Sequence, residues 1–464
     1  MASSTDVGDT GRHSGDEAAS PAGTRPGARR SHTGSGGRLS STRTALFGPL
    51  TSSSTLFRRH RWWIDALVVF LVIRAIGILT LARFADLRDT TLGASLTVWD
   101  GQWMLAIATH GYDGVPYALT DARGIHTVDT AYAFFPGYPY LVGAIAKLPG
   151  VSPFGAAISV NLVLGCVAAV GAARLGMVCA RLMARRSLLG SSSERGTGWL
   201  SARSPIGPAP ERGTGLFLVV LFAATPMSIV LNMAYTEALF CALAVWALVG
   251  VLERRWLLAG TMAAISGLCR PTAAVVIGVV ILAAILFLWR SGDAVSRRAR
   301  MRAAIAIVIS PLGYLAYLGV VWAHTGSPTG WFRIQTEGWD TEFDWGVAAL
   351  RFVNEMLVHS AEIAPVATSW IVLGTIAMLG VAAWARLPWP VLLYGSLLVA
   401  QIVLSSGLMM SRPRLLLPAF VLLIPLAMAL ARMRPAVAGL VVVPIVAGSS
   451  WFGAHMLTVF PHAM

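Results

Sequence analysis

The residues best suited to catalysis lie in a polar, aromatic segment at 85–130, which follows the first long apolar run. Within this segment the motif WDGQW places Asp100 between Trp99 and Trp103. Tryptophan side chains prefer the interface between membrane and water, and a carboxylate held there could take a proton from an attacking hydroxyl group. Asp100 is therefore the candidate general base, with the two tryptophans as candidate substrate contacts. An interfacial aromatic belt with an incidental surface aspartate would have the same spacing.

Two further aromatic stretches follow this motif. His110 and Tyr112 are candidate substrate contacts, and His110 could also help to hold a phosphate group. The sequence AFFPGYP at 133–139 is an aromatic run stiffened by two prolines, which could line a groove for an isoprenoid chain. Ordinary helix breaking at a membrane interface would explain the same prolines.

Tyr235 and Glu237 lie at the tip between two apolar runs. A carboxylate near lipid is costly unless it pairs with a cation or faces a cavity, so both residues are candidate binding residues. A structural cap on the following helix is the alternative. In the loop at 324–345, Gln335 lies among tryptophans and acidic residues that suit sugar stacking and hydrogen bonding to hydroxyl groups. A folded lid without a catalytic role would have the same composition.

Three arginines lie where the membrane topology does not require positive charge. Arg270 precedes Pro271, and Arg412 and Arg414 flank Pro413, all near the predicted outer surface. The guanidinium group offers forked donors that match the oxygens of a phosphate group. These three arginines are therefore the candidate phosphate-binding residues.

The elements that must position these residues are membrane helices. Of the 464 residues, 56% are hydrophobic and 12% are charged, and the mean hydropathy is +0.67. We predict an all-α polytopic membrane protein with about eleven helices that cross a hydrocarbon core of about 30 Å. A further helix at 131–149 is predicted to lie in the interface or to re-enter the membrane. The spans are predicted at 63–84, 154–180, 214–232, 237–253, 256–270, 271–290, 303–323, 363–385, 388–406, 415–432 and 436–458.

The distribution of basic residues predicts the orientation in the membrane. The net charge is +14, but the basic residues lie in loops between apolar runs, so they indicate topology and no nucleic-acid partner. Residues 1–57 are rich in Ser, Gly and Arg and are predicted to form a disordered cytoplasmic tail. Residues 58–464 then form the transmembrane domain, with a flexible cytoplasmic loop at 187–213. This topology places the candidate site on the extracytoplasmic face of a cell membrane.

The sequence contains no motif that predicts a cofactor. It has neither HExxH nor CxxC, and its four cysteines fall inside apolar runs, where buried thiols are expected. A divalent metal is allowed but not supported by the sequence, and no other cofactor is predicted.

The string WDGQWMLAIATHGY, followed by AFFPGYP, resembles the signature of the PIG-V family of mannosyltransferases and its bacterial relatives. Later segments follow in the same order, namely TPMSIVLNMAYTEALF, GLCRPTAA, WFRIQTEGWDTEFDWG and RPRLLLPAF, so the resemblance covers about residues 62–430. It implies a GT-C-like fold in which Asp100 is the catalytic base, and Arg270 and Arg414 match later motifs. Many members of the GT-C class have a second acid where this chain has Gly101, and this departure leaves a metal requirement in doubt.

The reaction that the resemblance implies is an inverting glycosyl transfer within membrane lipids. Mannose, or another hexose, would move from a polyprenyl-phosphate donor to a glycolipid or glycan acceptor on the extracytoplasmic face. A polytopic lipid or glycan transporter is one alternative, which Arg74 within the first predicted span favours. A noncatalytic subunit of a glycan-assembly complex is the other.

Overall fold

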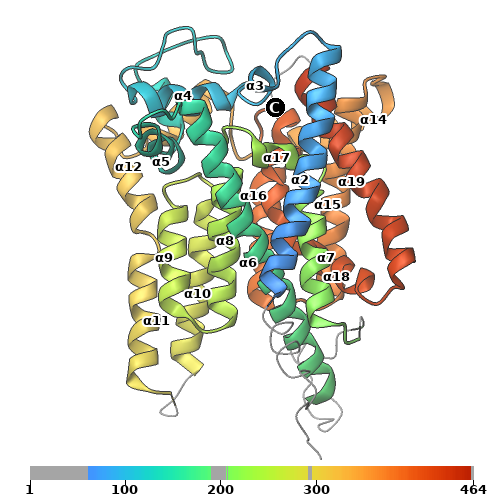
Figure 1. Cartoon of the computed structure of the whole chain (residues 1–464). Coiled ribbons are helices and arrows are strands. Elements are labelled where there is room, and N and C mark those ends of the chain that lie inside the picture. The colour runs from blue at the N-terminus through green and yellow to red at the C-terminus, as the bar shows by residue number, and fades with distance from the viewer. Residues whose placement is uncertain (1–60, 190–204, 206, 291–294, 461–464) are drawn as a thin grey trace, which may run out of the picture. The chain divides into compact units, whose positions relative to one another are not determined.

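The computed structural model describes residues 61–189, 205, 207–290 and 295–460. The predicted tail at 1–57 and most of the predicted loop at 187–213 lie outside these residues. Every regular element in the described part of the chain is a helix, and an isolated bridge joins Phe343 to Ser405 (Figure 1). The all-α prediction is therefore confirmed.

Six helical segments among the described residues are long and apolar enough to cross a membrane. They are α2 (Trp62–Leu87), α6 (Pro153–Leu189), α10 (Ala273–Arg290), α11 (Arg297–Ile309) together with α12 (Leu312–Thr325), α15 (Ile363–Trp384) and α19 (Pro435–Thr458). A seventh span would be a segment bent by 54°, which comprises η3 (Met409–Ser411), α17 (Arg412–Leu415), η4 (Leu417–Leu423) and α18 (Ile424–Leu430).

The other predicted spans coincide with shorter helices. These are α7 (Glu211–Ala223), α8 (Glu237–Leu252), α9 (Trp256–Ser266) and α16 (Trp389–Val403). A helix rises about 1.5 Å per residue, so none of the four reaches the thickness of a hydrocarbon core. Length and composition thus support six or seven crossings among the described helices, and the count of about eleven stays a prediction.

The remaining helices lie between these spans. They are α3 (Leu92–Ser95), α4 (Asp100–His110), η1 (Thr130–Ala133), α5 (Gly137–Ala146), η2 (Ser228–Asn232), α13 (Gly330–Trp339) and α14 (Val347–His359). Helix α5 has 10 residues and is about 15 Å long. It is too short to cross the membrane, which agrees with the interfacial or re-entrant helix predicted at 131–149.

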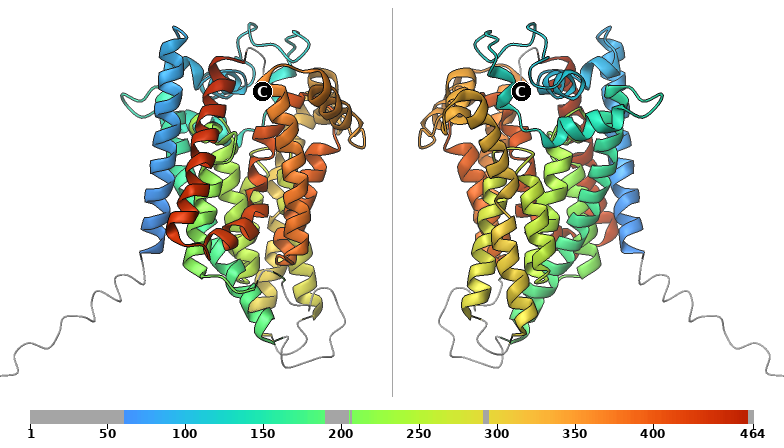
Figure 2. Two further views of the ribbon diagram at one scale, coloured as in Figure 1. Left: turned by 90° about the vertical axis from the view of Figure 1, so that its right-hand side faces the viewer. Right: turned by 90° about the vertical axis from the view of Figure 1, so that its left-hand side faces the viewer.

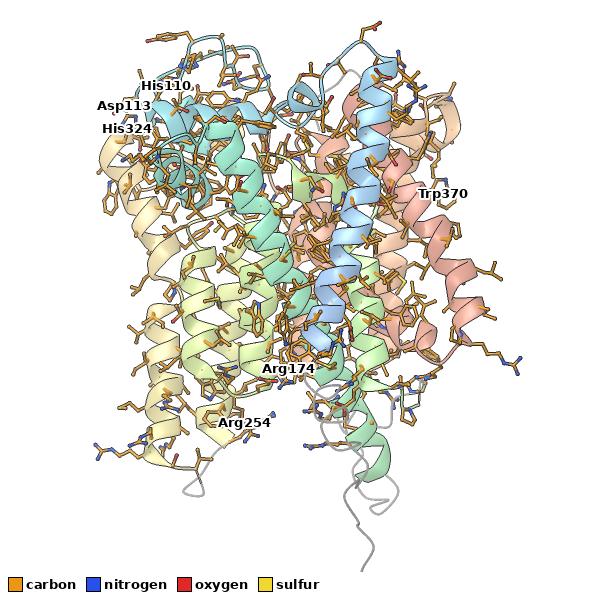
Figure 3. All side chains as sticks on the ribbon, viewed as in Figure 1. His110, Asp113, Arg174, Arg254, His324 and Trp370 are labelled. Atoms are coloured by element: carbon orange, nitrogen blue, oxygen red, sulfur yellow. The ribbon has the colours of Figure 1, made fainter. Side chains whose placement is uncertain are left out.

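The segments predicted to lie outside the membrane gather at one end of the helix bundle. Helices α3, α4, α5 and α14 lie at the upper end in Figure 1. In Figure 3, His110, Asp113 and His324 are at this end, and Arg254 is at the opposite end. The loops predicted on one side of the membrane therefore lie at the opposite end of the bundle from those predicted on the other side. Which end faces the cytoplasm stays a prediction.

Prolines determine where the arginine motifs leave regular helix. Arg270 lies in the break between α9 and α10, because a residue before a proline avoids the helical region. In the bent segment Pro413, Pro418 and Pro425 lie in the first turns of α17, η4 and α18, where a missing N–H group is tolerated. Non-helical backbone within the hydrocarbon region of a membrane is stable only when it is buried in protein or lines a cavity. The breaks therefore place the arginines inside the protein.

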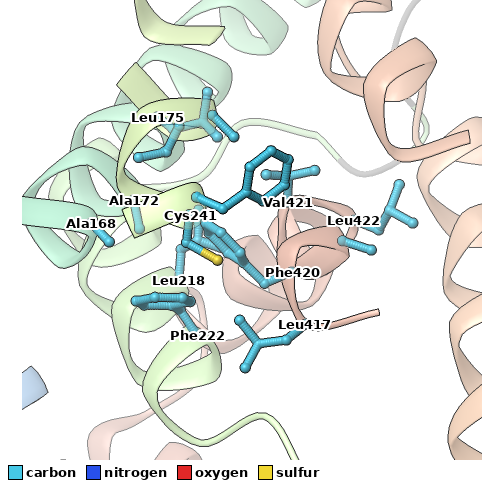
Figure 4. Close-up of a cluster of buried hydrophobic side chains, with 14 of the residues drawn as sticks. Ala168, Ala172, Leu175, Leu218, Phe222, Cys241, Leu417, Phe420, Val421 and Leu422 are labelled. Atoms are coloured by element: carbon cyan, nitrogen blue, oxygen red, sulfur yellow. The ribbon is translucent and has the colours of Figure 1, made fainter. Parts of the chain in front are cut away.

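The core forms where α6, α7, α8 and η4 meet (Figure 4). Ala172 of α6 lies beside larger side chains, and the rings of Phe222 and Phe420 are 4.6 Å apart. Small residues allow close helix packing in membranes. A Cβ atom on Gly215 of α7 would lie 2.6 Å from the carbonyl oxygen of Ala173 in α6. This contact fixes α7, which leads through η2 to Tyr235 and α8.

The first and last of the described helices are neighbours, since α2 packs against α19 (Figure 2). Arg74 lies within α2 and is 4% exposed. Its guanidinium group donates hydrogen bonds to Asn232 Oδ1 (2.7 Å), the carbonyl oxygen of Ala223 (2.8 Å) and Ser228 Oγ (2.5 Å). A Cβ atom on Gly77 would lie 2.7 Å from Arg74 Nη2, so the glycine makes room for this side chain. Arg74 thus joins α2 to the α7–η2 segment through neutral partners.

We expect Arg74→Met to lower the free energy of unfolding by about 2 kcal/mol, because Asn232 and Ser228 lose a buried hydrogen-bond donor. Thermal unfolding of the purified protein in detergent measures this loss. Arg83→Met is the matched control on the same helix, because the Arg83 side chain is 63% exposed and a surface ion pair contributes about 0–1 kcal/mol. Equal unfolding midpoints for the two variants would contradict the structural role of Arg74.

Candidate functional site

A cavity of about 810 Å³ lies among α4, α10, α13, α16 and α17. This volume is within the range of about 300–1,000 Å³ that is typical of small-molecule sites. Five residues that the sequence predicts for the site line this cavity: Asp100, Arg270, Gln335, Arg412 and Arg414. Six others do not: Trp99, Trp103, His110, Tyr112, Tyr235 and Glu237.

Asp100 is the first residue of α4, where the positive end of the helix dipole favours a carboxylate. The preceding residue, Trp99, has φ +53° and ψ −119°, a backbone conformation that is sparsely populated for residues other than glycine. Such strain persists only when the surrounding structure enforces it, and it is concentrated at functional sites. The turn at Trp99 directs the chain into α4 and places Asp100 at the cavity.

Asp100 forms an ion pair with an arginine from a distant part of the chain. Arg414 Nη1 donates to Asp100 Oδ2 at 2.5 Å, and the Arg414 guanidinium carbon lies 5.1 Å from the centre of the Tyr235 ring. The Tyr235 hydroxyl group donates to the carbonyl oxygen of Val98 (3.1 Å). Asn161 of α6, which is fully buried, donates to the carbonyl oxygen of Tyr235 (3.0 Å). Tyr235 therefore supports the pair from outside the cavity.

A second buried ion pair lies between Glu237, the first residue of α8, and Arg270. Arg270 Nη2 is 3.3 Å from Glu237 Oε1, and the side chains are 9% and 1% exposed. The Arg270 guanidinium carbon also lies 5.5 Å from the centre of the Phe240 ring. Glu237 is thus paired with a cation, as a buried carboxylate requires, and it holds Arg270 at the cavity wall.

The guanidinium group of Arg412 is largely occupied by backbone carbonyl groups. It donates to the carbonyl oxygens of Ile402, Ser405 (2.5 Å) and Ser406 (2.8 Å), at the C-terminal end of α16. Arg412 therefore fixes the turn that follows α16, and fewer of its N–H groups remain for a ligand than the sequence prediction assumed.

The aromatic run at 133–139 forms another wall of the cavity, to which Ala133, Phe134 and Phe135 contribute. The carbonyl oxygen of Phe134 accepts hydrogen bonds from the hydroxyl groups of Tyr112 (2.7 Å) and Tyr317 (2.6 Å). Burial raises the pKa of Tyr112 above its usual range, so that this hydroxyl group stays a donor. Gln335 of α13 donates to the carbonyl oxygen of Ala133 (3.1 Å). These bonds join the wall to α12 and α13.

Many buried polar atoms at the cavity have no hydrogen-bond partner among the described residues. Buried polar groups are almost always paired, so each exception requires an explanation such as an unseen water or ligand. Across the described residues, twelve buried side-chain nitrogen and oxygen atoms have no hydrogen-bond partner, and seven of these atoms belong to residues that line the cavity. The seven residues are Arg270, Thr272, Trp331, Gln401, Ser411, Arg412 and Arg414. The cavity is therefore suited to a polar, anionic ligand.

The predicted residues outside the cavity have other positions. The ring of Trp103 stacks on Phe134 at 5.1 Å, behind the cavity wall, and Trp99 forms the strained turn. His110 is exposed at the far end of α4, about 15 Å along the helix from Asp100. The structure thus places His110 away from the arginines that it was expected to assist.

The sequence prediction missed, among other cavity residues, Thr272, Gln401 and Ser411, whose side chains carry buried polar atoms without a hydrogen-bond partner among the described residues. Gln401 lies inside the apolar helix α16, and a polar side chain within a membrane helix usually faces the protein interior. That signal could have identified it. Thr272 and Ser411 could not have been found in this way, because short hydroxyl side chains often bond to their own helix backbone.

We expect Gln401→Leu to stabilise the protein by about 1 kcal/mol, because it removes a buried oxygen that has no hydrogen-bond partner among the described residues. The same variant should have about tenfold lower activity, because a stabilising change at a functional site commonly costs function. Thr368→Val is the matched control, since Thr368 Oγ1 is also buried and unpaired but lies outside the cavity. This control should gain stability and keep its activity. Unfolding midpoints and the activity of the cavity site test both variants, and equal activities would separate Gln401 from the site.

The described residues offer no obvious metal site, because they contain no group of three or more His, Cys, Asp or Glu side chains close enough to share an ion. Two acids, Asp100 and Glu342, line the cavity together with its three arginines.

No protein-family model matches the chain, and no curated protein matches it. The solved structures that are similar in fold include two of ArnT from Cupriavidus metallidurans. The structure bound to undecaprenyl phosphate has a TM-score of 0.46 and 14% identity, covering 84% of this chain and 69% of ArnT. The apo structure has a TM-score of 0.46 and 15% identity, covering 84% of this chain and 62% of ArnT. At this level neither similarity establishes a shared activity.

Proposed function

We propose that this chain is an inverting glycosyltransferase with a GT-C-like fold. It moves mannose from a polyprenyl-phosphate donor to a glycolipid or glycan acceptor on the extracytoplasmic face. The observation that carries the proposal is the meeting of Asp100 with Arg270 and Arg414 at one cavity with unpaired polar atoms. The resemblance to the PIG-V family, which rests on the motifs around these same residues, supports mannose as the sugar.

The reaction is a single displacement at the anomeric carbon. Asp100 accepts the proton of an acceptor hydroxyl group, whose oxygen forms a bond to the anomeric carbon from one face. The bond between this carbon and the phosphate oxygen breaks on the opposite face, so the configuration inverts. Polyprenyl phosphate leaves with both electrons of that bond, and the charge on its phosphate group grows from −1 to about −2.

The arginines act on this growing charge. Donors that are fixed in advance stabilise the transition state more than the ground state when charge develops beside them. Arg270 Nη1 and Arg414 Nε have no hydrogen-bond partner among the described residues, so protein acceptors do not occupy either guanidinium group completely. Arg412 contributes mainly by its charge, because carbonyl groups occupy most of its donors.

The lining of the cavity suits the two parts of a lipid-linked sugar. Trp331, Gln335 and Trp339 of α13 provide aromatic surface and an amide group for a hexose. Leu397, Ala400 and Leu404, at α16 and its end, provide apolar surface for an isoprenoid chain. Arg74, which favoured a transporter, is held by neutral protein groups and does not line this cavity.

Deletion of the gene and comparison of the extracted glycolipids by mass spectrometry tests this proposal. A lipid that accumulates one hexose short of the wild-type product is expected, and its fragmentation identifies the acceptor. Purified protein with polyprenyl-phosphate mannose should then restore the missing hexose with inverted anomeric configuration. Movement of an intact lipid across the membrane without a new glycosidic bond would instead identify a transporter.

A further inference from the structure

A second cavity, of about 400 Å³, lies at the end of the bundle opposite to Asp100, where Figure 3 labels Arg254. Arginines from three separate segments line it: Arg186 of α6, Arg254 of the turn between α8 and α9, and Arg290 at the end of α10. No acidic side chain is among the described residues that line it. The cavity therefore concentrates positive charge.

This positive charge is not neutralised by the described part of the protein. None of the three arginines forms an ion pair with a described acidic residue. The neighbouring acid, Glu253, is already paired with Arg174 at 2.5 Å. Arg254 also has a positive φ of +57°, a conformation that is uncommon for a residue other than glycine. Like charges that converge in this way favour the binding of an anion.

Tryptophans place this cavity at the depth of lipid headgroups. Trp289, next to Arg290, is 79% exposed, and Trp384, at the end of α15, is 61% exposed. Exposed tryptophans at helix ends mark the interface between membrane and water. Trp389 and Trp256 also line the cavity, and the Trp256 indole nitrogen is buried without a hydrogen-bond partner among the described residues.

We propose that this cavity binds the phosphate-bearing headgroup of an anionic phospholipid in the membrane leaflet opposite to the active site. Guanidinium groups match phosphate oxygens with paired donors, and basic pockets between membrane helices bind anionic headgroups. A soluble phosphate ester would use the same chemistry, so the test includes it. The proposal is independent of the glycosyltransferase activity, because no residue of the first cavity takes part.

The test compares two triple variants that remove equal charge from the same end of the protein. Arg186→Gln/Arg254→Gln/Arg290→Gln removes the cavity arginines. The matched control, Arg185→Gln/Arg297→Gln/Arg298→Gln, removes exposed arginines that do not line the cavity. Thermal unfolding in detergent is followed while phosphatidylglycerol, phosphatidylcholine or inorganic phosphate is added at constant ionic strength.

Phosphatidylglycerol is expected to stabilise the wild type saturably, and phosphatidylcholine is not. The cavity variant should bind phosphatidylglycerol at least tenfold more weakly, and the control within twofold of the wild type. If the cavity variant does not fold, Arg254→Gln alone, a change at an exposed side chain, should still weaken binding about threefold. Equal saturable binding of inorganic phosphate, lost in the cavity variant, would support the site and assign a soluble phosphate ester. Equal weakening in both triple variants, or no saturable binding of either anion, would overturn the proposal.

Discussion

Replacement of Asp100 by asparagine is expected to lower the rate of sugar transfer about a thousandfold, within the range of general-base catalysis. Asparagine has nearly the same shape and can still accept a hydrogen bond from Arg414, but it cannot take a proton from the acceptor. The Asp100 side chain is 28% exposed, so the protein should remain folded. The measurement is kcat at saturating polyprenyl-phosphate mannose, with a change in donor KM of less than about threefold, because only the transition state uses the proton transfer.

Asp113→Asn is the matched control for this variant. Asp113 is an exposed acid in the same polar segment at 85–130, and its described side-chain contact is a long hydrogen bond of 3.3 Å from the Tyr132 hydroxyl group. Its replacement should leave the transfer rate within about twofold of the wild type. If Asp100→Asn retains more than a tenth of the wild-type rate, another group accepts the proton.

Replacement of Arg270 by glutamine is expected to lower kcat/KM about a hundredfold, because a fixed donor to the leaving phosphate group is lost. This variant should also be less stable by about 3–5 kcal/mol, because the fully buried carboxylate of Glu237 loses its cation. The unfolding midpoint and the initial rate of transfer measure these two effects separately.

The double variant Glu237→Gln/Arg270→Gln distinguishes a role in catalysis from a role in folding. It removes both charges of the pair, so most of the lost stability should return, since a buried ion pair replaced as a unit costs little. Activity should stay low, because no guanidinium group remains at that wall of the cavity. Recovery of activity together with stability would show that Arg270 acts only through the fold.

The helical architecture could largely be predicted from the sequence. Apolar runs such as 63–84 and 363–385 specify membrane helices because lipid cannot satisfy the hydrogen bonds of any open backbone. The motif around Asp100 was also recognisable, because tryptophans mark the interface. The number of membrane crossings could not be read from the apolar runs, since short helices such as α9 and α16 are apolar but do not reach across the membrane by themselves.

Which side chains meet at the cavity could not be predicted, because the distances between segments far apart in the sequence are not encoded in any local pattern. Arg414 and Arg412 are two residues apart, yet Arg414 pairs with Asp100, whereas Arg412 donates to the carbonyl groups after α16. His110 and Asp100 belong to one motif, yet the length of α4 separates them. Sequence spacing gives the type and order of side chains, and the direction of each side chain follows from the packing around it.

The apolar runs and motifs of the sequence already indicate a helical membrane protein with an acid near a predicted interface and arginines beside prolines. The folded chain was needed to show that Asp100, Arg270 and Arg414 share one cavity. The same is true of Arg186, Arg254 and Arg290, which share another. In the first cavity this is because a buried charge must find a partner, and the partner can come from any segment that helix packing brings within a few ångströms.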